Sequence, residues 1–150
     1  MKTIRVVTDI AAPVETVWTH LSAVADYAAW NPFITQFQGE LVPGSRAKIR
    51  IVPPGGRPMT FRPTITKVEE GRGLEWLGKV LLPGVFDGRH LFHLETLGDG
   101  RTRLIQAEEF SGVLVPLMGT TLERTRAGFE AMNEALRMRA ETTAATDLSR

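Results

Sequence analysis

Apolar residues recur every three or four positions in the last third of the chain, a spacing typical of one face of an amphipathic helix. No proline interrupts the segment after Pro116, up to about residue 141. A helix of this length spans roughly 39 Å, enough to cross a small domain. The pattern therefore predicts a long helix that buries one stripe against a large apolar surface. The stripe consists of Met118, Leu122, Thr125, Phe129, Met132, Leu136 and Ala140.

Alternating apolar and polar residues predict strands over most of the remaining chain. The first covers residues 4–10, and Pro13 with Glu15 then marks the start of a helix. A second short helix over 24–30 ends before Pro32. Turn residues separate six further segments of strand length, and Pro63 inside one of them indicates an edge or a bulge. These segments are 34–41, 45–52, 58–69, 73–82, 86–97 and 102–112.

This order of elements predicts the fold class. Strands that follow one another with short turns form an antiparallel sheet, and helices gathered on one face of such a sheet are typical of an α+β fold. A chain of 150 residues suits one domain with one core, which we assign to residues 1–141. The small, polar segment 142–150 is expected to fray.

Polar residues lie on the inward faces of the last two predicted strands. His90 alternates with Phe92 on one strand, and Gln106 alternates with Glu108 on the next. A three-residue loop over 98–100 would keep both apolar sets on one face, whereas a two-residue turn would put them on opposite faces. We therefore predict that His90 lies opposite Glu108, with Cβ atoms within about 5.5 Å. A buried carboxylate needs such a partner, or water, or a polar group of a ligand.

The composition excludes several classes of function. Hydrophobic residues make up 43% of the chain and charged residues 23%, as in an ordinary globular protein. The net charge of +1, without blocks of like charge, argues against nucleic-acid binding. No apolar run approaches the roughly 20 residues of a membrane span. The alternating N-terminus does not resemble a signal peptide, so a cytoplasmic location is expected.

Motifs of the common catalytic centres are missing. The chain has no cysteine, which excludes disulfides, thiol nucleophiles and thiolate metal ligands. It has neither a phosphate-binding glycine loop nor a Gly-x-Ser-x-Gly turn. His90 and His93 have a spacing seen in metal sites, but alternation along a strand places their rings on opposite faces. We therefore expect no metal and no cofactor.

Several short runs nevertheless share a pattern that covers about residues 3–141. They include Trp30-Asn31-Pro32-Phe33, Leu74-Glu75-Trp76 and Gly128-Phe129, and the longer runs 10–18, 86–92, 102–112 and 133–136. Together they resemble the SRPBCC superfamily of START-like and pollen-allergen-like domains, specifically its polyketide cyclase/dehydratase-like branch.

The resemblance implies a helix-grip fold. In this fold a seven-stranded antiparallel sheet curls round a long C-terminal helix, two short helices follow the first strand, and a deep hydrophobic cavity lies inside. Members bind lipids, sterols, hormones or polyketides, and some are cyclases, dehydratases or ring-hydroxylase subunits. The branch has no single catalytic motif to carry over, and fold alone does not decide function.

The first of three hypotheses is a carrier or sensor for a small lipid-, polyketide- or aromatic-like molecule. Trp30 and Phe33 would form a gate, and His90, Gln106 and Glu108 would hold one polar group of the ligand. Pockets of this kind measure about 300–1,000 Å³. The expected lining is Trp30, Phe33, Ile49, Ile51, Phe61, Trp76, His90, Phe92, Gln106, Glu108, Phe110, Met118, Leu122, Phe129 and Met132.

Two other hypotheses stay open at this stage, so whether the chain is an enzyme is undecided. In a cyclase- or dehydratase-like enzyme, Glu108 and His90 would be the catalytic acid–base pair, with Gln106 beside a developing enolate oxygen. The third hypothesis is a packed interaction or stress-related protein without a ligand. Leu77 and Leu81 on the outer face of the sheet hint at a homodimer.

Overall fold

The computed structural model describes residues 1–80 and 82–148 and consists of two antiparallel sheets, a long C-terminal helix and short helices. Five strands pair in the order β1-β8-β7-β6-β5, and three in the order β2-β3-β4. The elements are β1 (Lys2–Ile10), α1 (Val14–Ser22), η1 (Val24–Asp26), α2 (Tyr27–Trp30), β2 (Ile34–Gln38), β3 (Lys48–Ile51), β4 (Met59–Phe61), β5 (Thr64–Glu69), β6 (Gly73–Val80), β7 (Phe86–Leu97), β8 (Arg101–Ser111), η2 (Val115–Leu117) and α3 (Gly119–Leu148).

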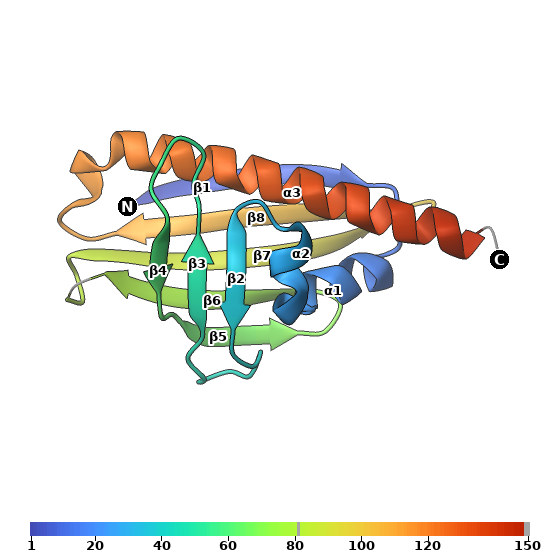
Figure 1. The fold of residues 1–150 in the computed structure, drawn as a ribbon, viewed down its shortest axis with the longest axis horizontal. Helices are drawn as coiled ribbons and strands as arrows, with labels where there is room; N and C mark the ends of the chain where they lie inside the picture. Colours follow the sequence, from blue (N-terminus) through green and yellow to red (C-terminus); the bar gives the residue numbers. More distant parts are fainter. Residues whose placement is uncertain (81, 149–150) are drawn as a thin grey trace.

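The layers enclose one core. In Figure 1 the helix α3 runs along the five-stranded sheet, the three-stranded sheet crosses that sheet, and α1 with α2 lies toward the C-terminal half of α3. Buried apolar side chains from every layer meet between them, including Leu21 from α1, Ile49 from β3, Trp76 from β6 and Phe129 from α3. This arrangement is the α+β architecture that the order of elements predicts.

The prediction of a single seven-stranded sheet is wrong, because the segment 58–69 is split at Pro63. Proline has no N–H to donate, so a ladder cannot continue through it. The chain pairs with β3 as β4, bends at Arg62-Pro63, and then pairs with β6 as β5. The Ala47 N–H donates to the Pro63 carbonyl at 3.0 Å. Such bends are how strands pass from one sheet to another across a corner.

The long helix is confirmed, but both of its predicted ends are wrong. Pro116 lies in the 3₁₀ turn η2, so α3 begins at Gly119 and Met118 precedes it. The helix continues through Thr142 to Leu148; residues 149–150 of the predicted tail lie outside the described residues, and fraying of this end stays a prediction. The Thr142 and Thr146 hydroxyls donate to carbonyls one turn earlier, at 2.8 and 3.0 Å, so this polar end is held by local bonds. The rest of the predicted stripe is buried.

The register predicted for the last hairpin is confirmed. A loop over residues 98–100 joins β7 to β8, and its positive φ angles, 64° at Asp99 and 70° at Gly100, suit a three-residue turn. His90 pairs with Glu108, and Phe92 pairs with Gln106. The polar residues therefore share the inward face with the apolar ones.

The predicted homodimer and the predicted absence of a membrane span concern the outer surface of the protein. Leu77 is half-buried, and Leu81 lies outside the described residues, so a homodimer stays a prediction. No helix within residues 1–80 and 82–148 has both the length and the apolar character needed to cross a bilayer.

Candidate functional site

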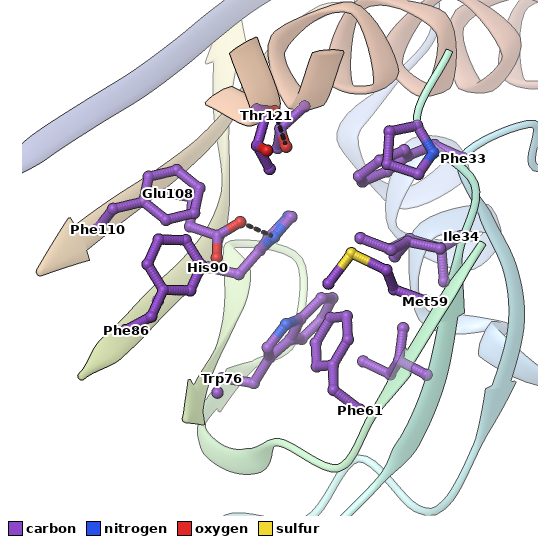
Figure 2. A pocket seen from close by; sticks show the side chains of 16 residues that line it. Phe33, Ile34, Met59, Phe61, Trp76, Phe86, His90, Glu108, Phe110 and Thr121 are labelled. Carbon is purple, nitrogen blue, oxygen red and sulfur yellow. Dashed lines mark hydrogen bonds and ion pairs between the residues drawn. The ribbon is translucent and has the colours of Figure 1, made fainter. Parts of the chain in front are cut away.

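A cavity lies between the two sheets and the first turns of α3, as Figure 2 shows. Its volume is about 70 Å³, well below the roughly 300–1,000 Å³ expected for a ligand pocket. That is smaller than an engineered cavity of about 150 Å³ that holds benzene. It is lined by Phe33, Ile34, Ile49, Ile51, Pro53, Met59, Phe61, Trp76, Gly78, Phe86, Gly88, His90, Glu108, Phe110, Thr121 and Thr125.

Two paired glycines leave the floor of the cavity without side chains. Gly78 on β6 lies opposite Gly88 on β7, and both line the cavity. A Cβ at Gly78 would meet the Phe61 ring at 3.6 Å, an ordinary contact, whereas a Cβ at Gly88 would lie 2.2 Å from Oε2 of Glu108. Gly88 therefore makes room for the carboxylate, and Gly78 makes room for the cavity itself.

A chain of hydrogen bonds runs from the cavity to the first strand. His90 Nδ1 lies 3.2 Å from Glu108 Oε1, and its Nε2 lies 3.0 Å from Gln106 Oε1. Gln106 Nε2 donates to Asn133 Oδ1 at 2.7 Å. Asn133 Nδ2 then donates to the Thr8 hydroxyl at 3.1 Å and to the Val6 carbonyl at 3.4 Å. Glu108 is the one member that lines the cavity together with His90.

The direction of these hydrogen bonds determines which nitrogen of His90 carries a proton. A backbone carbonyl can only accept, so Val6 fixes the orientation of the Asn133 amide and, through it, that of Gln106. The Gln106 oxygen faces His90 Nε2, which must therefore carry a proton. The contact from Nδ1 to Glu108 then holds one proton, either on the carboxyl or on the imidazole. Both forms of the pair have zero net charge.

Aromatic rings enclose the imidazole of His90, which is 4% exposed. Trp76 stacks on it with a centroid distance of 4.7 Å and an angle of 21°. The centroids of Phe92 and Phe129 each lie 4.9 Å from that of His90. The face of an indole attracts a cation, so this enclosure is compatible with the imidazolium form as well as the neutral one.

Eight of the residues predicted to line a cavity do so: Phe33, Ile49, Ile51, Phe61, Trp76, His90, Glu108 and Phe110. The others lie elsewhere. Phe92 and Phe129 support the His90 ring, and Gln106 is fully buried inside the hydrogen-bond chain. The side chains of Leu122 and Met132 belong to the core, and Met118 packs against it. The helix stripe mainly fills the core, while Thr121 and Thr125 of α3 line the cavity.

The predicted gate of Trp30 and Phe33 is not found. Trp30 packs edge-on against Tyr27 at 5.3 Å, and the Arg139 guanidinium lies 5.9 Å from its ring. Phe33 is 2% exposed and contacts Phe129, so it belongs to the inner wall. Met59 is the one exposed side chain of the lining and marks the outer side of the cavity; the half-buried lining residues are Ile51, Phe61, Gly78, Phe86, Glu108 and Thr121.

Sequence reasoning missed part of the cavity lining and one member of the hydrogen-bond chain. Strand alternation puts Gly78 and Gly88 on the inward faces of their strands, and that signal could have identified the empty floor. Asn133 follows Phe129 by four residues, so helical spacing could have placed it beside the buried stripe. The missed lining residues are Ile34, Pro53, Met59, Gly78, Phe86, Gly88, Thr121 and Thr125.

Sequence comparison places this chain in a known family. Residues 1–141 match the family described as polyketide cyclase / dehydrase and lipid transport. The chain belongs to this family. It is thus a member of the SRPBCC superfamily, as the short runs indicated. No curated protein matches the sequence.

Solved structures share the fold of this family member. A START superfamily protein from Mycobacterium smegmatis is 20% identical, with a TM-score of 0.63, and the match covers 89% of this chain and 98% of that one. DynU16, a putative protein in the dynemicin biosynthetic locus, is 22% identical with a TM-score of 0.70, and the match covers 96% of this chain and 49% of that one. XoxI from Bacillus cereus is 14% identical with a TM-score of 0.73, and the match covers 100% of this chain and 99% of that one. These likenesses show the fold alone.

Proposed function

We propose that the protein binds a small apolar molecule in this cavity and holds one polar group of that molecule at Glu108. One observation carries the proposal: a carboxyl group with a free oxygen lies in a space that is otherwise almost entirely apolar. Glu108 Oε1 contacts His90, but Oε2 accepts no hydrogen bond from the described residues. A polar group at such a place fixes the orientation of a bound apolar molecule.

The size of the cavity limits how a ligand enters. A space of about 70 Å³ is too small for a ring of benzene size, so side chains on its outer side have to move. Met59 is 42% exposed and belongs to the short strand β4. A methionine has an unbranched, adaptable side chain, and it is the residue best suited to open the cavity.

A titration followed by NMR tests the proposal. Freshly purified protein is first analysed by native mass spectrometry for a bound compound, and then titrated with 4-methylphenol. We expect shifts of the Met59 methyl and of the Gly78 and Gly88 amides, and we expect Gly78→Val to remove them because its side chain fills the floor. Gly98→Ala, at a loop position with nothing within 4 Å, is the matched control. Unchanged binding by Gly78→Val would show that the ligand site lies elsewhere.

A second candidate, favoured by the shared proton of His90 and Glu108, is an acid–base enzyme of the cyclase or dehydratase kind. Glu108 Oε2 would accept a proton from a substrate carbon next to a carbonyl and return it at a later step. Solvent deuterium exchange into the CH₂ of bound phenylacetone is the measurement. We expect exchange in the wild type and none above background in Glu108→Gln. Equal exchange in both proteins would remove this candidate.

The third hypothesis, a packed protein without a ligand, agrees with the small volume of about 70 Å³, and an apolar compound bound to the freshly purified protein would remove it.

A further inference from the structure

We infer that the polar group received by Glu108 is a hydrogen-bond donor, such as a hydroxyl or an N–H, and not an isolated carbonyl. This inference rests on the proposed ligand-binding function and specifies the class of ligand. It follows from the direction of the hydrogen-bond chain, which leaves Oε2 of Glu108 as an acceptor.

The first step is the orientation of the two buried amides. If both were turned round, Asn133 Oδ1 would face the Val6 carbonyl at 3.4 Å, and two acceptors would oppose each other in a buried site. The orientation in the structure avoids this. Gln106 and Asn133 are 0% and 1% exposed, so water does not compensate a reversed arrangement. His90 Nε2–H is therefore committed to Gln106.

The second step places the remaining proton of the pair. The contact of 3.2 Å between His90 Nδ1 and Glu108 Oε1 requires a proton between these two atoms. In the neutral form the proton is on Oε1, and in the ionic form it is on Nδ1. A proton on Oε2 would leave Nδ1 and Oε1 as two facing acceptors. In both favourable forms Oε2 is without a proton.

The third step concerns the surroundings of Oε2. Its near neighbour Gly88 has no side chain, so no side-chain donor comes from that position. The Thr125 hydroxyl, also in the lining, donates to the Thr121 carbonyl at 2.8 Å and is committed there. The Thr121 hydroxyl also lines the cavity but makes no hydrogen bond to Oε2 within the described residues, so this oxygen is open to a donor from a ligand or from water. A carbonyl oxygen in the same place would bring two acceptors together, and a site of this kind strongly rejects the wrong group.

Ligand binding is also coupled to the position of the shared proton. A donor at Oε2 stabilises the carboxylate, and so moves the proton toward His90. The resulting imidazolium lies over the Trp76 ring at 4.7 Å, where the indole face attracts a cation. A bound hydroxyl compound should thus increase the imidazolium fraction, and a bound ether should not.

Three matched aromatic probes test the inference by NMR titration of the full chain: 4-methylphenol, its methyl ether 4-methylanisole, and 4′-methylacetophenone. We expect the phenol to bind about tenfold more tightly than either of the others, because one charge-assisted hydrogen bond distinguishes them. Glu108→Leu should reduce this preference to less than about twofold. Glu108→Gln should keep part of it, because the new amide N–H would face His90 Nδ1 and its oxygen would face the cavity.

The outcomes separate this inference from the proposed function. Equal binding of the three probes, or tighter binding of the ketone, overturns the inference while the binding site remains. Failure of all three to shift the cavity resonances overturns both. The ¹⁵N shifts of His90 give a second readout that does not depend on affinity. Nε2 must have the shift of a protonated nitrogen in the free protein, and an unprotonated Nε2 would refute the hydrogen-bond direction.

Discussion

Gly128 lies in the interior of α3, where an alanine ordinarily stabilises a helix by about 1 kcal/mol. Here the opposite is expected. A Cβ at this position would lie 2.2 Å from Cδ1 and 2.5 Å from Cε1 of Phe33, whereas ordinary contacts begin at 3.4 Å. The ring would have to move by about 1 Å or more. Phe33 is 2% exposed and packs against Phe129 at 5.6 Å, so there is little space to move into on that side.

The net effect of Gly128→Ala follows from two opposing free energies. Overpacking a core costs about 1–3 kcal/mol, and an overlap with two ring atoms belongs at the upper end. After the gain in helix propensity is subtracted, the free energy of unfolding should fall by about 2 kcal/mol. For a chain of this length that lowers Tm by roughly 4–8 °C. Because Phe33 also lines the cavity, the displaced ring should enter it and weaken binding of 4-methylphenol.

Urea and thermal unfolding measure the stability of this variant, and NMR titration measures its binding. Gly119→Ala is the control, because nothing lies within 4 Å of a Cβ at the first residue of α3. Combining Gly128→Ala with Phe33→Leu should cost less than the sum of the two single changes, since the smaller side chain removes the overlap. A Gly128→Ala protein that is as stable as the wild type would refute this reasoning.

Three further changes have expected outcomes. Gly88→Ala should displace the Glu108 carboxylate, since its Cβ would lie 2.2 Å from Oε2, and unchanged affinity for 4-methylphenol would contradict this. Burial, and secondly the charge of Arg139, lowers the pKa of His20 below 6.5, so the unfolded state binds the extra proton first. The free energy of unfolding should therefore fall as pH drops below about 6.5, and less so in His20→Gln, as urea unfolding from pH 7.5 to 5 would show. Tyr27→Phe should cost about 1–2 kcal/mol in the same assay, because its buried hydroxyl donates to a carbonyl of α1, and no loss would contradict that role.

Local patterns were sufficient for the buried face of the long helix and for the register of the last hairpin. The stripe from Leu122 to Ala140 follows from helical spacing, since every third or fourth side chain shares a face. The pairing of His90 with Glu108 follows from the loop at 98–100, because a slip of one residue would turn an apolar set outward. Both conclusions depend only on residues close in sequence or joined by one turn.

Other features depended on contacts between distant segments. Pro63 indicates an edge or a bulge from the sequence alone, but its consequence, two sheets in place of one, depends on what β4 and β5 pair with. Trp30 is expected at a gate because it shares a short turn with Phe33. The two side chains point to different neighbours, since α2 ends at Trp30 and the chain is extended at Asn31.

The sequence by itself determined the order of most strands and helices and which of their faces are apolar, because periodicity is a property of the local backbone; it did not fix the ends of α3 or the break between β4 and β5. Only the tertiary structure decided where space remains between these faces. Gly78 and Gly88 become a cavity floor when their strands pair, and Gln106 reaches Asn133 when the helix packs across β1 and β8. Each depends on side chains from separate elements meeting in three dimensions, which no spacing along one element specifies.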